Sequence, residues 1–296
     1  MLEDGEYSPW IKSVFGSIKS AVILLGIRQY STWLNNLIEY YFKHNKGARE
    51  AEYKHFRYAA DRVDGRWQRQ RMLSRPDSWA QVFDSFTIDE QHVTAQVLMN
   101  AGTETTATAL SGLTFYLLQD PVAMEKLKKE VRSEISSLRD VTFEALARLK
   151  YTQTCLTEAL RLYPPVPEGL RRRTPPGGVT ICGKAVPGDV TVGVHHMATY
   201  RSSAHFRNPD RFAPERWLGD PEYADDHRDA FEPFQTGPRN CLGQSLAWHE
   251  MRLLLVTVIR RFDLSLEPES QRWLNQKTYI LWEKIPLMCR LRLVET

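Results

Sequence analysis

The stretch that decides the fold is Phe234-Gln-Thr-Gly-Pro-Arg-Asn-Cys-Leu-Gly243, near the C-terminus. It places Cys241 in a loop rich in turn-forming residues, with Arg239 two residues before it, and an apolar segment with helical periodicity follows. The thiolate is the form of cysteine that binds a metal, and positive charge and a helix N-terminus both favour it. Gly237 and Gly243 let the backbone approach a large flat partner closely. Phe234 can pack against such a partner, and Arg239 can pair with an anionic group on it. The stretch therefore predicts a loop that presents a thiolate to a metal.

A buried structural cysteine is the usual interpretation of a lone Cys at a loop-to-helix junction. Five specified residues at fixed spacing argue against it here. The stretch resembles the haem-binding loop of the cytochrome P450 family, Phe-x-x-Gly-x-Arg-x-Cys-x-Gly, with every fixed position filled. The resemblance implies iron protoporphyrin IX held by the Cys241 thiolate, which favours cleavage of the O–O bond of dioxygen. It also assigns Phe234, Gly237, Arg239 and Gly243 to the haem site.

A second motif, Ala101-Gly-Thr-Glu-Thr-Thr106, lies inside a helical stretch expected from about Ile88 to Leu118. Thr87 and Glu90 predict a capping box at its start, and Asp120-Pro121 ends it. Small Ala101 and Gly102 leave room for a ligand, and the adjacent threonine hydroxyls can open the helix locally. The motif resembles the oxygen-binding groove of the family, where the acid and the following threonine help to deliver protons to dioxygen. These are Glu104 and Thr105 here, acting as in general acid catalysis. A threonine-rich surface helix is the alternative.

Two further motifs predict a buried charge network. Glu158-Ala-Leu-Arg161 puts its two ends on one helix face, before a proline-terminated helix end at 162–165. It resembles the family's Glu-x-x-Arg motif, and Pro214-Glu-Arg-Trp217 resembles Pro-Glu-Arg-Phe with Trp in place of Phe. The resemblance implies that Arg216 joins Glu158 and Arg161 behind the haem and clamps the segment leading to Cys241. An exposed helical ion pair is the alternative for Glu158 and Arg161.

The segment Leu170-Arg-Arg-Arg-Thr174 resembles a family segment in which an arginine pairs with a haem propionate. Alignment on Gly177 and Gly178 favours Arg172, with its neighbours Arg171 and Arg173 as alternatives. Arg171 departs from the family, which often has proline at that position. A solvated basic turn is the other interpretation.

The remaining pattern indicates a mainly α fold with small β-sheets (α+β), the C-terminal part of the cytochrome P450 fold, as a single partial domain over 1–296. We expect an amphipathic helix over 121–138 with Val122, Leu127 and Val131 on its apolar face. Short strands are expected over 179–194, with His195 and His196 pointing apart on a strand, and a terminal hairpin within 263–293. The helices of 11–42 resemble those that roof the substrate channel, but the family's N-terminal sheet and its helices on the near side of the haem are not matched.

Composition limits the partners, the compartment and the membrane attachment that can be expected. The formal charge of +3, spread along 296 residues, gives no reason to expect nucleic acid as a partner. The four cysteines have no paired spacing, so three are expected to be reduced and structural, in a reducing, cytosol-facing compartment. No apolar run is long enough for a transmembrane anchor, whereas an intact eukaryotic family member has one and lies at the endoplasmic reticulum membrane. The 21–27 run permits either peripheral membrane contact or a cap over the substrate pocket.

Two functions follow as hypotheses. The first is a haem-dependent monooxygenase that takes electrons from an NADPH-dependent reductase and oxidises a hydrophobic small molecule. Such a substrate fits the apolar residues that resemble pocket walls: Val97, Leu98, Val166, Leu170, Ile280 and Leu281. The segments 101–110 and 194–201 resemble those of family members from filamentous fungi, many of which act in secondary metabolism. The second hypothesis is a truncated, non-catalytic remnant of such an enzyme that does not retain haem. A zinc or iron–sulfur protein does not fit, because cysteine and histidine ligands are not clustered.

Overall fold

The computed structural model describes residues 19–20, 22–24, 26–27, 31–69 and 85–294, so parts of the expected 11–42 roof and 21–27 run lie outside it. The chain forms two compact units, one ending at Thr103 and the other beginning at Glu104. Helix α5 (Ile88–Gln119) contributes to both units.

The first unit contains α2 (Thr32–His44), α3 (Lys46–Arg69) and the first part of α5. The capping box expected for α5 is confirmed: the Thr87 amide donates to Glu90 Oε2 at 2.8 Å, and the Glu90 amide donates to Thr87 Oγ1 at 3.4 Å. The backbone hydrogen bond from Thr87 also lowers the pKa of Glu90. A small apolar cluster of Ala59, Val63 and Ala95 joins α3 to α5.

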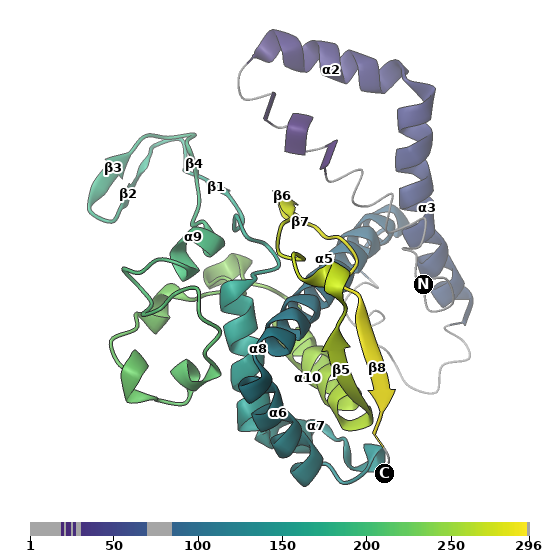
Figure 1. Ribbon diagram of the computed structural model, residues 1–296. Coiled ribbons are helices and arrows are strands. Elements are labelled where there is room, and N and C mark those ends of the chain that lie inside the picture. The colour runs from purple at the N-terminus through teal and green to yellow at the C-terminus, as the bar shows by residue number, and fades with distance from the viewer. Residues whose placement is uncertain (1–18, 21, 25, 28–30, 70–84, 295–296) are drawn as a thin grey trace. The chain divides into compact units, whose positions relative to one another are not determined.

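The second unit contains the remaining helices around one large apolar core (Figure 1). They are α6 (Pro121–Glu134), α7 (Phe143–Arg148), α8 (Lys150–Leu162), α9 (His196–Tyr200) and α10 (Gln244–Arg261). The short 3-10 turns are η2 (Leu138–Asp140), η3 (Pro214–Trp217), η4 (Pro221–Tyr223), η5 (Arg228–Ala230), η6 (Gly237–Arg239) and η7 (Pro268–Ser270). Helices α6, α8 and α10 pack on one another, and Leu127, Leu156 and Val256 are at most 1% exposed at their contacts. The core therefore fixes α8, which carries Glu158 and Arg161, beside α10, which begins directly after the Cys241 loop.

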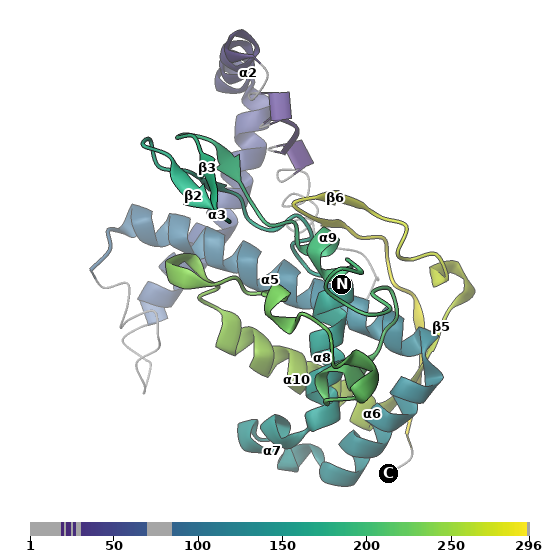
Figure 2. The same cartoon turned by 90° about the vertical axis from the view of Figure 1, so that its left-hand side faces the viewer.

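Four antiparallel two-stranded sheets complete the second unit. They are β1 (Arg172–Arg173) with β4 (Thr191–Val192), β2 (Val179–Ile181) with β3 (Lys184–Val186), β5 (Phe262–Leu266) with β8 (Cys289–Leu293), and β6 (Lys277–Tyr279) with β7 (Leu281–Glu283). The β2–β3 hairpin stands clear of α6, α7, α8 and α10 in both views (Figures 1 and 2). The expected mainly α fold with small sheets is confirmed.

Two expectations about side-chain placement are wrong. Val122 is 66% exposed, because it precedes Leu127 by five residues and so lies about 140° round α6 from it. His195 and His196 do not lie on a strand: His195 caps α9 by accepting from the Ala198 amide, and buried His196 stacks on Tyr200. Burial also lowers the pKa of His196.

The terminal segment contains the expected hairpin, formed by β6 and β7. Strand β8 does not join it and pairs with β5, from Phe262 opposite Leu293 to Leu266 opposite Cys289. Pro286 lies between β7 and β8 and has no amide to donate to a ladder, which separates the two pairings. The expected local opening of α5 is also absent, since α5 is continuous through 101–106. Ser and Thr hydroxyls can share a carbonyl with the helix, as Ser111 does with Ala107 O at 2.8 Å.

Candidate functional site

The loop between Phe234 and Gly243 is closed by its own backbone. The Cys241 amide donates to the Phe234 carbonyl at 2.8 Å, so the two ends of the motif lie together. Gly237 has φ +76° and Gln235 has φ +58°, and the left-handed conformation at Gly237 is one that glycine adopts without strain. The loop is therefore a defined turn that presents Cys241.

Helix α10 begins directly after this turn. Gly243 is its N-cap residue, and the Ala247 amide donates to the Gly243 carbonyl at 2.8 Å. The unpaired amides of the first turn and the helix dipole favour negative charge near a helix N-terminus. A Cβ added to Gly243 would lie 4.0 Å from Cys241 Sγ, so glycine leaves the space beside the sulfur open. Cys241 itself is exposed.

The surroundings of Cys241 combine apolar and cationic groups. Leu242 is 88% exposed, and the Phe234 ring packs at 5.6 Å from the Trp248 ring of α10. Arg239 is exposed, and within the described residues its side chain makes no hydrogen bond or ion pair. A ligand on this surface would meet an apolar contact beside the sulfur and a free guanidinium close to it in sequence.

Three candidate arginines precede the β2–β3 hairpin, and the structure separates them. Arg172 donates through its NH2 group to Gln235 Oε1 at 2.6 Å, within the Cys241 loop. Arg171 pairs with Glu168 at 3.2 Å, and Arg173 pairs with Asp189 at 3.0 Å. Arg172 is therefore the arginine of the three that contacts the loop.

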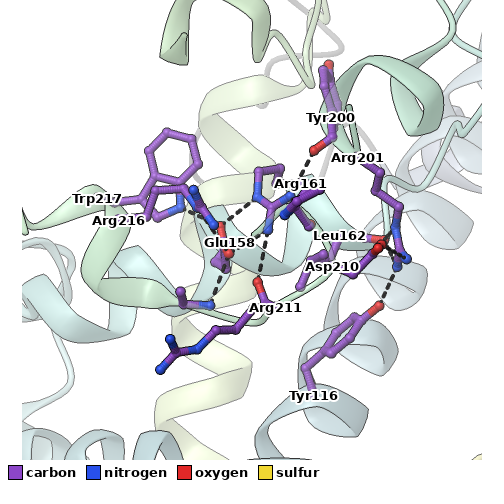
Figure 3. Close-up of polar contacts among 12 residues, drawn as sticks. Tyr116, Glu158, Arg161, Leu162, Tyr200, Arg201, Asp210, Arg211, Arg216 and Trp217 are labelled. Atoms are coloured by element: carbon purple, nitrogen blue, oxygen red, sulfur yellow. Dashed lines mark hydrogen bonds and ion pairs between the residues drawn. The ribbon is translucent and has the colours of Figure 1, made fainter. Parts of the chain in front are cut away.

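The predicted network residues lie together and are fully buried (Figure 3). Arg161 binds Glu158 in a bidentate pair, with distances of 2.9 and 2.7 Å. Arg216 Nε lies 3.4 Å from Glu158 Oε1, and its NH1 group pairs with Asp226. The remaining guanidinium donors of Arg161 go to the carbonyls of Tyr200, Pro209 and Arg211 at 2.8, 2.6 and 3.1 Å. Each buried charge therefore has partners, as burial of charge requires.

Trp217 links this network to the cysteine loop. Its indole Nε1 donates to Glu158 Oε2 at 2.9 Å, which a phenylalanine at this position could not do (Figure 3). Its ring lies 5.0 Å from that of Phe231, which precedes Phe234 by three residues. The contact gives a continuous path from α8 through η3 to the loop.

A second, partly exposed polar cluster supports the end of α8. Arg201 donates to the Leu162 carbonyl at 2.8 Å and to the Tyr116 hydroxyl at 2.7 Å, and it pairs with Asp210 at 2.9 Å (Figure 3). A cation at a helix C-terminus satisfies carbonyls that have no partner within the helix. Burial raises the pKa of Tyr116. This cluster ties α5, α8 and the segment after α9 together.

The residues of the oxygen-groove motif lie on α5. Ala101 and Gly102 are exposed on the part of α5 that belongs to the first unit. In the second unit, Glu104 is buried, 4% exposed, and Thr105 is half-buried. Lys284 Nζ lies 2.8 Å from Glu104 Oε2 and 2.5 Å from Thr108 Oγ1. The acid of the motif is therefore held in a buried ion pair.

Several residues of these clusters have partners that the sequence motifs do not predict. Asp226 and Lys284 belong to no motif, and Gln235 occupies a variable position of the Phe234–Gly243 stretch. Their partners lie 10, 180 and 63 residues away in sequence. The hydrogen bond of Trp217 could have been predicted, because a buried indole N–H usually finds an acceptor. The place of Thr108 beside Glu104 could also have been predicted, since it lies four residues further along on the same helix face.

The other cysteines differ in environment. Cys155 is buried and Cys289 is half-buried, and burial raises the pKa of both thiols. Cys182 is exposed on the β2–β3 turn, so the expected structural role is wrong for it, because no core surrounds a hairpin tip. No group of three or more Cys, His, Asp or Glu side chains able to hold a metal ion occurs in the described part of the chain. A single exposed thiol fits a metal that a planar cofactor brings with it, and the apolar surface at Leu242, the open space at Gly243 and the free Arg239 fit such a cofactor.

A mainly helical fold with a cysteine loop at the start of a long helix is the arrangement that the resemblance implies. The family model for cytochrome P450 matches residues 43–290. The chain therefore belongs to the cytochrome P450 family.

Curated fungal proteins match nearly the whole chain. Cytochrome P450 monooxygenase efuB of Hormonema carpetanum is 46% identical over 99% of this chain and 59% of its own length. Cytochrome P450 monooxygenase FUM2 of Gibberella moniliformis is 41% identical over 98% of this chain and 62% of its own length. Cytochrome P450 monooxygenase AMT3 of Alternaria alternata is 40% identical over 99% of this chain and 60% of its own length. The chain thus spans about three fifths of the length of these relatives.

Among the helices of the described ranges, none combines the length and apolar character needed to cross a bilayer.

Proposed function

We propose that the chain carries the haem-ligand, oxygen-groove and structural-network portion of a haem-dependent monooxygenase. The reaction inserts one oxygen atom of dioxygen into a hydrophobic small molecule and releases the other as water. Two electrons from an NADPH-dependent reductase and two protons balance it. Membership of the cytochrome P450 family and the names of the fungal relatives support this reaction class. The proposal includes a place in fungal secondary-metabolite biosynthesis, at the cytosolic face of the endoplasmic reticulum, as the family resemblance implies.

The observation that carries the proposal is the geometry of the Phe234–Gly243 turn. Its closing hydrogen bond presents exposed Cys241 at the start of α10. There the sulfur would bind the haem iron. When bound, a thiolate-ligated haem supplies the redox chemistry that cleaves dioxygen. Phe234, Gly237 and Gly243 would shape the surface against the haem, and Arg239 and Arg172 would bind its propionates. Ala101 and Gly102 leave space beside α5.

The proton-handling residues are Glu104 and Thr105. We assign Thr105 the hydroxyl that passes protons to the reacting oxygen, and Glu104 the carboxylate that exchanges them with water. Glu158, Arg161 and Arg216 are assigned a structural role, since their side chains are fully buried and joined to the loop through Trp217.

The test is the carbon-monoxide difference spectrum of the purified, reduced chain after reconstitution with haem. We expect a strongly red-shifted Soret band, and Cys241→Ala should abolish haem retention. Cys182→Ala, which changes an exposed thiol of the hairpin, is the matched control and should leave the spectrum unchanged. An unshifted band, or the same band in Cys241→Ala, would overturn the ligand assignment. No band in the unmodified chain would favour the non-catalytic remnant.

A further inference from the structure

A buried ion pair joins the end of the β6–β7 hairpin to α5. The side chains of Lys284 and Glu104 are each 5% exposed, and their charged atoms lie 2.8 Å apart. Lys284 also donates to the hydroxyl of Thr108, which is 2% exposed. This contact spans 180 residues of sequence and brings a cation to the acid that the proposed function uses.

Stability alone does not account for this pair. Removing two charges from water is costly, and replacing a buried pair by apolar residues is often neutral or stabilising. Once the acid is present, however, losing its cation leaves an unpaired buried charge, which is strongly destabilising. The lysine is therefore understandable if the carboxylate at position 104 is needed for its chemistry.

The pair fixes the direction of the Glu104 carboxylate. Glu104 and Thr108 are four residues apart and share one face of α5, whereas Thr105 lies about 100° round the helix. Lys284 bridges Glu104 Oε2 and Thr108 Oγ1 on that face. Within the described residues, Lys284 is the donor found on this carboxylate, and it uses Oε2. The other oxygen, Oε1, is left to exchange protons.

The lysine is itself held on both sides. Trp282 is buried, donates to the Pro164 carbonyl at 2.8 Å and stacks on Tyr163 at 4.5 Å. On the other side, the carbonyl of Ile285 accepts from the indole of buried Trp273 at 2.8 Å. The backbone that carries Lys284 is thus fixed independently of Glu104. A support fixed in advance is what a functional side chain needs for a precise position.

From these contacts we propose that Lys284 is a positioning residue for Glu104. It anchors Oε2 on the Thr108 side of α5 and leaves Oε1 to carry protons for Thr105. The inference rests on the proposed monooxygenase function and adds a specific residue to it.

The first part of the test needs no haem. Mass spectrometry after brief acetylation with an N-hydroxysuccinimide ester measures the reactivity of each lysine. We expect Lys284 to react at least about tenfold more slowly than exposed Lys277 of the same hairpin, because burial in an ion pair protects its amine. Glu104→Gln should remove much of that protection. Equal reactivity of the two lysines in the unmodified protein would show that Lys284 is not held in a buried ion pair and would overturn the proposal.

The second part compares Lys284→Met and Glu104→Gln, alone and combined, with Lys277→Met as the matched control. The readouts are urea unfolding and, in the haem-loaded chain with reductase, product formed per NADPH from a fluorogenic alkoxycoumarin. Lys284→Met should lower that ratio by about tenfold, the scale expected when a catalytic group is misplaced. It should lower the ratio no further in the Glu104→Gln background, because the group being positioned is then already gone.

A merely structural lysine gives a different result. Lys284→Met would then destabilise the protein to urea but leave product per NADPH unchanged, which would overturn the proposal. Thr108→Val keeps both charges and removes the second anchor of the ammonium. If Lys284→Met does not fold, Thr108→Val provides the same comparison. We expect it to lower product per NADPH, and an unchanged ratio would contradict the proposal. Absence of the red-shifted band in the unmodified chain would instead reject the proposed function, while the acetylation result would still report on the pair.

Discussion

At the scale of single residues, Trp217 shows how one side chain can serve two environments. Its indole N–H donates to a fully buried carboxylate, while its ring packs on Phe231 beside the loop. Phenylalanine keeps most of the packing and loses the donor. The family pattern has phenylalanine here, so the hydrogen bond to Glu158 is an addition that this chain makes to its network.

Trp217→Phe should destabilise the protein by about 1.5–3 kcal/mol, the net contribution of a hydrogen bond to a charged group. Among the described residues, Glu158 Oε2 then keeps only its hydrogen bond from Arg161 Nε. Urea unfolding followed by circular dichroism measures the change. Trp33→Phe on α2, where the indole is 70% exposed, should change the stability by no more than about 0.5 kcal/mol. Equal effects of the two substitutions would mean that the contact with Glu158 contributes nothing.

Thr105 supports a prediction of a different kind, because its expected role is chemical. In the haem-loaded chain with reductase, Thr105→Ala should keep the thiolate spectrum but divert electrons from product to hydrogen peroxide. We expect product per NADPH to fall by at least about tenfold, because general acid catalysis contributes roughly 10²–10⁴-fold to a rate. Thr105→Ser retains the hydroxyl and should stay near the unmodified ratio. An unchanged ratio in Thr105→Ala would remove this hydroxyl from the mechanism.

At the scale of elements, the contact between α6, α10 and the β5–β8 pair depends on Asp263. Arg132 of α6 donates to its carboxylate at 2.9 Å and also to the Ile259 carbonyl at the end of α10. Lys128 and Arg292 lie 3.2 and 3.1 Å from the same carboxylate. The hydrogen bond from Arg132, with those from Lys128 and Arg292, holds the pKa of Asp263 well below its usual range.

This lowered pKa predicts how stability changes with pH. An unfolded Asp titrates near pH 4, and the folded carboxyl titrates lower, so the unfolded state binds more protons between the two. The contribution of Asp263 is therefore complete above about pH 4 and is lost as the pH falls through the folded pKa. We expect Asp263→Asn to cost roughly 1–2 kcal/mol at pH 7, and the difference from the unmodified protein to shrink below about pH 4.

Urea unfolding between pH 7 and pH 3 measures this difference. Asp229→Asn is the matched control, because Asp229 is exposed and makes no ion pair within the described residues. A penalty for Asp263→Asn that stays constant down to pH 3 would contradict the assigned charge state.

Elements with strong local signals could be predicted from the sequence. The capping box at Thr87, the Asp120-Pro121 start of α6 and the end of α8 at Leu162 are set by neighbouring residues, and all three are confirmed. Strand partners were harder, because β5 and β8 are separated by 22 residues that contain another sheet. Nothing local distinguishes β8 pairing with β7 from β8 pairing with β5.

The site likewise has residues that local motifs predict and residues that only tertiary packing brings in. Motif spacing identified Glu158, Arg161 and Arg216 as candidates, and the structure brings their side chains together. Asp226 and Lys284 complete buried clusters through contacts that no spacing rule encodes. Buried charges require partners, so the sequence indicates that partners exist, but tertiary packing decides which residues they are.

At the scale of the whole molecule, the two units differ sharply in the core that each one buries. In the described part of the first unit, the apolar cluster consists of Ala59, Val63 and Ala95, with Trp67 and Met99 packed on it. The second unit buries large side chains from every one of its long helices, including Leu113, Leu127 and Val256. Opening of a region is resisted by the apolar surface that it buries, so the two units should differ in local stability.

Hydrogen–deuterium exchange with mass spectrometry should therefore divide the chain near Thr103. We expect amides of α8 and α10 to exchange at least about a hundredfold more slowly than those of α2, whose Trp33 and Tyr40 are 70% and 64% exposed. Within α5, amides near Leu113 should be protected more strongly than amides near Val93, although both lie in one continuous helix. The comparison inside a single helix controls for intrinsic helix propensity, since differences in protection there reflect packing. Uniform protection along α5 would show that the chain unfolds as one cooperative unit, and the boundary at Thr103 would then have no energetic meaning.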